Sequence, residues 1–155
     1  VSADTPDEVL KNWDALKKQE KEQKTFTDTM RSVPRAFPAL MRAQKVQKRA
    51  ARAGFDFAGA SEVYDKIAEE MVVLSDACSS GDTSSIRDEY GDLLFSVVIL
   101  ARFIKVDAEE ALAAAADKFI DRFDAVEKLA AERGMDMPST PMNELDKLWD
   151  EVKEG

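Results

Sequence analysis

The sequence contains no histidine, and this absence excludes more kinds of site than any other feature of its composition. Without histidine there is no Ser-His-Asp or Cys-His catalytic arrangement, no histidine-ligated zinc, and no Glu-x-x-His di-iron centre. Any acid–base or metal chemistry in this chain must therefore use carboxylates, lysine or water.

Cysteine, glycine and proline are also scarce. Cys78 is the single cysteine, so no internal disulfide can form, which fits a reducing compartment and predicts a cytoplasmic protein. Six glycines and five prolines in 155 residues are too few for the frequent turns of an all-β chain. No apolar run reaches membrane-spanning length, and the first residues show no signal-peptide pattern. The composition favours an all-helical protein.

The charge is strongly one-sided. The chain carries 31 acidic and 22 basic residues, for a net charge of −9 at neutral pH. This balance argues against nucleic acid and against an anionic membrane surface as partners, because both are bound through excess lysine and arginine. A small phosphorylated ligand stays compatible, since a bound cation can reverse the local charge.

The apolar spacing indicates a series of amphipathic helices. It predicts a polar helix within residues 1–24, a loop over 25–33, further helices over 35–53, 61–78, 84–104 and 108–133, and a short last helix carrying Leu145 and Leu148. We divide the chain into an N-terminal helix and linker, residues 1–33, and a helical domain, residues 34–155. Short turns between long helices predict an antiparallel bundle.

The apolar stripes of the helices over 84–104 and 108–133 are more extensive than a small monomer can bury, which predicts a homodimer. The inward residues expected on the first of these helices are Ile86, Tyr90, Leu93, Leu94, Val97 and Val98.

Four carboxylates form the clearest candidate site. Glu69 and Glu70 lie on the helix over 61–78, and Glu89 and Asp92 lie three residues apart on one face of the next helix. If the two helices pack side by side, Glu70 approaches Glu89 and Asp92. Such carboxylates repel one another unless a cation lies between them, and oxygen ligands alone select Mg²⁺, or alternatively Mn²⁺. The competing interpretation is a solvated acidic face, which the charge pattern alone favours by about two to one. The apolar Leu93 beside Asp92 places this acid at the edge of the buried face and shifts the balance toward a functional role.

Two basic residues and one tryptophan are further candidates. Lys118 and Arg122 lie four residues apart on one helix face and could hold phosphate oxygens, although the pattern alone favours an ordinary solvated face, since Asp117 and Asp121 lie beside them. Trp149 could stack on a base, but an isolated tryptophan more often anchors a helix by packing.

Several blocks of the sequence resemble the MazG family of nucleoside triphosphate pyrophosphohydrolases. They include Lys66–Glu70 (KIAEE), Glu89–Phe95 (EYGDLLF) and Asp117–Phe123 (DKFIDRF), preceded by Pro34–Arg49 and Gly54–Phe57. The resemblance implies an all-α, MazG-like helical bundle, paired as a dimer. It also implies hydrolysis of NTP or dNTP to NMP and pyrophosphate with Mg²⁺, to remove non-standard or surplus nucleotides. The likeness is greatest to the C-terminal of two MazG domains in a bacterial two-domain protein, which leaves open whether this chain is part of a longer one.

The resemblance also implies roles for individual residues. Glu70, Glu89 and Asp92 match metal ligands, and Glu69 matches the first position of a Glu-Glu-x-x-Glu motif, where a carboxylate could orient or deprotonate the attacking water. The positions of Lys118, Arg122 and Trp149 match those that bind substrate.

Three positions depart from the family pattern, each by an apolar residue. Val73 stands where the third glutamate of the first motif is expected, and Ile99 and Ala116 stand where asparagines are common. Losing a carboxylate removes a metal ligand and a negative charge, and both determine affinity for Mg²⁺. The alternative hypothesis is therefore a weakened or inactive MazG-like domain that serves dimerisation or a structural role beside an active domain.

Overall fold

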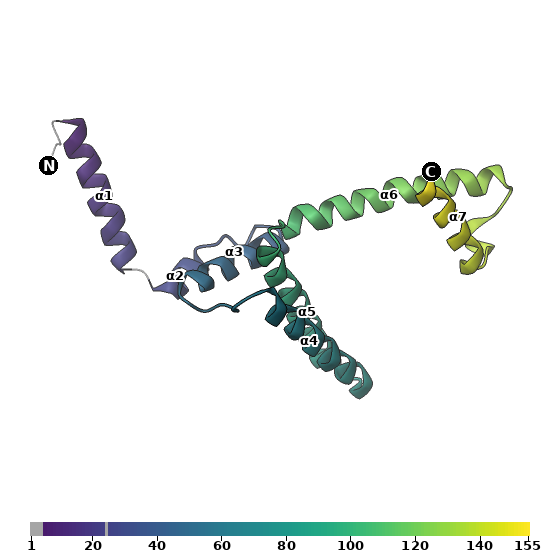
Figure 1. Ribbon diagram of the computed structural model, residues 1–155, viewed down its shortest axis with the longest axis horizontal. Coiled ribbons are helices and arrows are strands. Elements are labelled where there is room, and N and C mark those ends of the chain that lie inside the picture. The colour runs from purple at the N-terminus through teal and green to yellow at the C-terminus, as the bar shows by residue number, and fades with distance from the viewer. Residues whose placement is uncertain (1–4, 24) are drawn as a thin grey trace. The chain divides into compact units, whose positions relative to one another are not determined.

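The computed structural model describes residues 5–23 and 25–155, and Figure 1 shows its helices. This part of the chain contains seven α-helices, one short 3-10 helix and no strand, so the predicted all-α class is confirmed. Within the same residues, no helix combines the length and the apolar composition needed to cross a bilayer. The chain divides into two compact units, Val1–Ala108 and Glu109–Gly155. The elements are α1 (Pro6–Gln23), α2 (Phe26–Arg31), α3 (Ala39–Arg52), α4 (Ala60–Ser80), α5 (Thr83–Phe103), α6 (Ala108–Glu132), the 3-10 helix η1 (Met137–Ser139) and α7 (Met142–Glu154).

A helical hairpin of α4 and α5 is the main feature of the first unit. Gly81 ends α4 in the left-handed conformation, with φ of 73°, and its N–H donates to the carbonyl of Ala77 at 3.2 Å. Asp82 then caps α5, its side chain accepting from the backbone N–H of Ser84 at 3.2 Å. Because only these two residues join the helices, α4 and α5 pack side by side in opposite directions (Figure 1). Val63 of α4 is fully buried.

Two predictions near the start of this unit were wrong. Residues 25–33 were expected to form a loop, but α2 begins after Thr25. The Thr25 hydroxyl accepts a hydrogen bond from the N–H of Asp28 at 3.1 Å. In return, the Asp28 carboxylate accepts one from the N–H of Thr25, also at 3.1 Å. This capping box was readable as T-x-x-D, but the helix is too short to show apolar periodicity. Helix α3 was expected from residue 35 and begins at Ala39, because Pro38 occupies the N-cap and disfavours a helical residue before it.

The buried face of α5 is narrower than predicted. Val98 is buried, and Ile86 and Leu93 are half-buried, but Tyr90, Leu94 and Val97 are exposed although they were expected to face inward. Helices α3 and α4 both contact α5, yet together they leave part of its apolar surface uncovered. The sequence pattern identified apolar positions correctly and could not tell which of them a single chain buries.

An ion pair connects the segment after α3 to the end of α5. The Arg102 guanidinium donates two hydrogen bonds to the Asp56 carboxylate, at 2.6 and 2.7 Å, across 46 residues of sequence. The Asp56 carboxylate also accepts from the N–H of Phe57 at 2.9 Å. Hydrogen bonding from Arg102 holds the pKa of Asp56 below its ordinary value. A bidentate pair of this kind fixes geometry as well as supplying energy.

We expect Asp56→Asn to lower the free energy of unfolding by about 1–2 kcal/mol at neutral pH. Because the folded-state pKa is lowered, this stabilisation is present above the ordinary aspartate pKa of about 4 and is lost as the pH falls through the lowered value. Urea unfolding of both proteins at pH 7 and in acid should therefore show a difference that shrinks in acid. Asp76→Asn, at an exposed aspartate of α4, is the control and should change stability by less than about 0.5 kcal/mol. An equal loss at both pH values would contradict the role of the pair.

The second unit is built from α6, η1 and α7. Val126 and Ala130 of α6 are buried against Leu148 of α7. The Arg133 guanidinium, just beyond α6, donates to both carboxylate oxygens of Glu151 at 2.9 and 2.6 Å. Apolar packing and this bidentate pair together hold α7 against α6.

Candidate functional site

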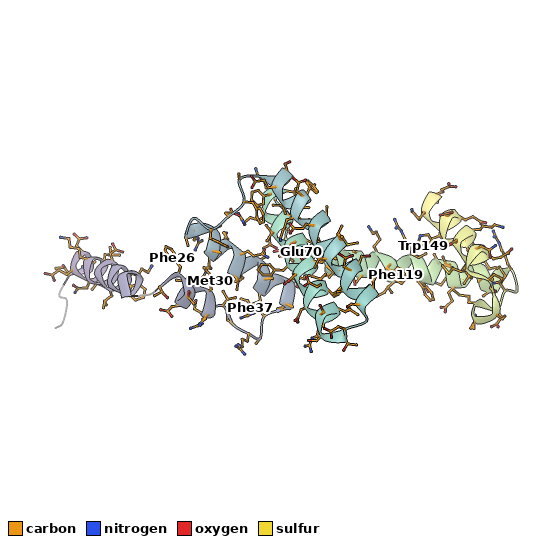
Figure 2. All side chains as sticks on the ribbon, turned by 90° about the horizontal axis from the view of Figure 1, so that it is seen from below. Phe26, Met30, Phe37, Glu70, Phe119 and Trp149 are labelled. Atoms are coloured by element: carbon orange, nitrogen blue, oxygen red, sulfur yellow. The ribbon has the colours of Figure 1, made fainter. Side chains whose placement is uncertain are left out.

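Three carboxylates converge between α4 and α5. Glu70 projects from α4, and Glu89 and Asp92 lie three residues apart on α5; one oxygen of each lies within 4.8 Å of the others. Glu70, labelled in Figure 2, is buried, with 8% of its surface exposed. Glu89 is half-buried and Asp92 is exposed. The structure therefore brings together the three residues that were predicted from the sequence to be metal ligands.

Lys66 is the nearest described counter-charge for the buried carboxylate. Its ammonium lies 2.8 Å from Oε1 of Glu70 and 3.5 Å from Oε2 of Glu69. The hydrogen bond with Glu70 is the main cause of the raised pKa of Lys66. Burying a carboxylate is costly unless it is paired, and one lysine does not neutralise three converging acids. Lys66 was not among the predicted site residues, although its spacing of three and four residues from Glu69 and Glu70 is the signal of such a contact.

Glu69 lies next to the cluster in sequence but is not one of its three converging groups. Its side chain is exposed and contacts Lys66. An exposed carboxylate can accept a proton from water, so this placement is compatible with the predicted role in orienting or deprotonating water.

The three departures from the family pattern occupy different surroundings. Val73 lies one helical turn after Glu70 on α4, with 36% of its surface exposed. Ile99 is half-buried on α5, where it lines a cavity, and Ala116 is exposed on α6 in the second unit. Of the three, Val73 is the position from which a carboxylate side chain would share a helix face with Glu70.

The predicted substrate-binding residues lie in the second unit. The Arg122 guanidinium carbon lies 6.0 Å from the ring centroid of Trp149, and the ring centroids of Phe119 and Trp149 are 5.4 Å apart. Phe119 and Trp149 are labelled in Figure 2. Trp149 also packs against the buried cluster of α6 and α7. Lys118 is exposed on α6. Trp149 therefore anchors α7 and contacts Arg122 at once.

The converging carboxylates fit a divalent cation. Their donor atoms are all oxygens, which hard cations such as Mg²⁺ and Mn²⁺ prefer, and they come from two helices held by a tight turn. Three like charges at this separation favour binding of a cation, because it relieves their mutual repulsion.

The known proteins that this chain resembles point to one family. Residues 59–127, which include all three converging carboxylates, match the MazG nucleotide pyrophosphohydrolase domain. The chain is 40% identical over 154 residues to the nucleoside triphosphate pyrophosphohydrolase of Escherichia coli K12 and 37% identical over 155 residues to the nucleoside triphosphate pyrophosphohydrolase/pyrophosphatase MazG of Thermotoga maritima. It is 39% identical over 155 residues to the uncharacterized protein YabN of Bacillus subtilis.

These matches cover almost all of this chain but only part of each relative. They span 98% of the chain and 59% of the E. coli protein, 100% of the chain and 59% of the T. maritima protein, and 99% of the chain and 32% of YabN. The domain match, the likeness over nearly the whole of this chain and the all-helical fold agree with one another, and residues 59–127 are similar to a MazG domain.

Proposed function

We propose that this chain hydrolyses nucleoside triphosphates or deoxynucleoside triphosphates to the monophosphate and pyrophosphate, with Mg²⁺ as cofactor and Mn²⁺ as a possible replacement. The observation that carries the proposal is the convergence of Glu70, Glu89 and Asp92 within 4.8 Å. The E. coli and T. maritima relatives are named for the same reaction class. Removal of non-standard or surplus nucleotides is the corresponding biological role.

In this reaction, a water oxygen attacks the α-phosphorus, and the bond from that phosphorus to the oxygen bridging to the β-phosphate breaks. Glu70, Glu89 and Asp92 would hold the cation, which when bound offsets phosphate charge and favours the attack. The exposed Glu69 carboxylate would orient the water and accept its proton. Glu69 and Glu70 share the Lys66 ammonium, so this lysine keeps both side chains on one side of α4.

We also propose that two basic residues of α6 bind phosphate oxygens. Lys118 and Arg122 are cations one helical turn apart, and arginine offers a planar fork to phosphate oxygens. Trp149 would complete this set, since its ring centroid lies 6.0 Å from the Arg122 guanidinium carbon.

The alternative function is a structural or dimerisation module beside an active domain. The apolar Val73, next to the carboxylate cluster on α4, favours it, because a third glutamate is expected there. One assay distinguishes the two functions. It measures the release of pyrophosphate and monophosphate from each common NTP and dNTP, with and without Mg²⁺. The enzyme releases both products in equal amounts only with the cation, whereas the structural module releases neither.

We also propose that the protein is a homodimer in the cytoplasm. Large apolar side chains are exposed on both helices of the hairpin, among them Met71 and Val72 of α4 and Leu94 and Val97 of α5. Extended exposed apolar surfaces are uncommon on monomers and mark interfaces. The lone thiol of Cys78 and a nucleotide substrate suit a reducing cytoplasm.

Light scattering at micromolar concentration is expected to give twice the chain mass of 17.2 kDa. The physical reason is burial of the exposed apolar surface of α4 and α5 against a second copy. Val97→Glu, which places a charge on that surface, should shift the mass toward the monomer. A monomeric mass for the unmodified protein would contradict the proposed dimer.

A further inference from the structure

The basic residues of this acidic chain are concentrated in one segment. Residues 29–55 hold seven of its 22 basic side chains and none of its 31 acidic ones, although an even distribution would place about five acids there. The seven are Arg31, Arg35, Arg42, Lys45, Lys48, Arg49 and Arg52. A run of cations is often an ordinary solvated face. Here, however, two of the arginines line a hollow in the first unit.

The hollow has a volume of about 460 Å³ and lies where α3 begins. This volume is in the range of small-molecule sites. Arg35 and Arg42 are the charged residues that line it, and Phe37 and Phe95 supply aromatic surface. Phe37, labelled in Figure 2, precedes α3, whereas Phe95 belongs to α5. The hollow therefore combines two cations with apolar walls.

Hydrogen bonds fix the backbone around the hollow. The N–H of Phe37 donates to the carbonyl of Pro34 at 3.3 Å and closes the turn that carries Arg35. The amide nitrogen of Gln47 on α3 donates to the carbonyl of Phe95 on α5 at 2.9 Å. The backbone positions of the two arginines are therefore set before a ligand arrives, which lowers the entropy lost on binding.

Neither arginine is neutralised by a neighbouring acid. Within residues 5–23 and 25–155, neither Arg35 nor Arg42 forms an ion pair. Arg42 is half-buried, and its Nε is enclosed without a hydrogen bond to any described group. A ligand would therefore meet its terminal guanidinium nitrogens rather than Nε. Holding an unpaired cation partly out of water is unfavourable, so an anion bound in the hollow would stabilise the folded chain.

The start of α3 adds to the positive potential. Pro38 occupies the N-cap, no side chain caps the helix there, and the first turn contains no acid. The N-terminus of a helix carries a partial positive charge and favours anions. Ala39, the first residue of α3, lines the hollow together with both arginines. The Lys45 ammonium lies 5.8 Å from the ring centroid of Phe37, so a third cation is close by.

We propose that this hollow is a further phosphate site, which binds a small phosphate-bearing anion through Arg35 and Arg42 without a metal ion. Several negative charges are needed to balance the groups around it, and phosphate chains or esters supply them, whereas a carboxylate supplies one. The Phe37 and Phe95 rings suit an organic group carried by the phosphate. The proposal does not rest on NTP hydrolysis, because neither arginine belongs to the carboxylate cluster.

Calorimetric titration with inorganic pyrophosphate in EDTA tests this site, because the carboxylates repel phosphate when no cation is present. The unmodified protein should bind the probe, and Arg35→Gln and Arg42→Gln should each weaken binding by about tenfold, the loss expected for one charge-assisted contact. Arg35 is exposed, so its variant should keep the fold even if Arg42→Gln lowers stability. Arg52→Gln, at an exposed cation of α3 that does not line the hollow, is the matched control and should stay within about twofold.

The absence of pyrophosphate binding at millimolar concentration would overturn the proposal. An equal loss in Arg52→Gln would also overturn it, because the whole basic segment would then attract the anion. A loss confined to Lys118→Gln and Arg122→Gln would place the anion on α6, with the same consequence for the hollow.

Two further probes, phenyl phosphate and inorganic phosphate, distinguish the sources of the anion in the same titration. Tighter binding of phenyl phosphate that Arg35→Gln weakens would assign the hollow to an organic phosphate. Equal or weaker binding of phenyl phosphate, with the same dependence on Arg35, would assign it to an inorganic phosphate chain. Both results support the site, whereas binding of all three probes that neither Arg35→Gln nor Arg42→Gln weakens would overturn it.

Discussion

Asp92→Asn is expected to weaken Mg²⁺ binding by about 10- to 100-fold and to reduce pyrophosphate release at limiting Mg²⁺ by a similar factor. The substitution keeps the size of the side chain and removes one of three negative charges whose oxygens lie within 4.8 Å. Affinity for a hard cation depends on the number and charge of its oxygen ligands. Because Asp92 is exposed, the variant should retain the fold, and the loss should report on the cation rather than on stability.

Calorimetric titration with MgCl₂, followed by the pyrophosphate assay over a range of Mg²⁺ concentrations, measures this effect. Asp65→Asn, at an exposed aspartate of α4 outside the cluster, removes the same charge and serves as the control. Long-range loss of negative charge would affect both variants equally, whereas ligation affects Asp92→Asn alone. Unchanged Mg²⁺ affinity in Asp92→Asn would remove Asp92 from the ligand set and with it the main support for the proposed function.

Val73→Glu is expected to have the opposite effect, tightening Mg²⁺ binding by about tenfold and raising NTP cleavage. The position follows Glu70 by three residues, so a glutamate there would add a second carboxylate from α4 opposite Glu89 and Asp92. Val73 is 36% exposed, and the new charge would therefore not be placed in a dry core. Without a cation the added repulsion should lower the melting temperature, and the gain on adding Mg²⁺ should exceed that of the unmodified protein.

Val73→Gln is the matched control, because it has nearly the same size as glutamate and carries no charge. Thermal melts and pyrophosphate release of the three proteins, measured in parallel across Mg²⁺ concentrations, separate charge from packing. Robust cleavage by the unmodified protein that Val73→Glu does not improve would show that the site works with its own ligands. Absence of cleavage in all three proteins would favour the structural-module alternative, with Ile99 and Ala116 as further obstacles.

The helices and the carboxylate cluster could be predicted from the sequence because the signals are local. Apolar spacing placed α4 and α5, and the short turn at Gly81 and Asp82 required them to be antiparallel neighbours. Glu89 and Asp92 share a face through the helix period alone. Their convergence with Glu70 then needed only the packing of adjacent helices, which the structure shows. The boundary errors at α2 and α3 arose where a capping box and Pro38 outweighed periodicity.

The features that only the tertiary structure decided depend on contacts between residues far apart in the sequence. The pairing of Asp56 with Arg102 and the hydrogen bond from Gln47 to the carbonyl of Phe95 each join residues more than 40 positions apart. No local pattern encodes these contacts, and they create the cavity beside α5. The same holds for burial: Tyr90 and Val98 both read as apolar positions of one helix, yet Val98 is buried and Tyr90 is exposed. Periodicity determines which residues share a helix face, whereas the arrangement of neighbouring helices determines which parts of that face lose contact with water.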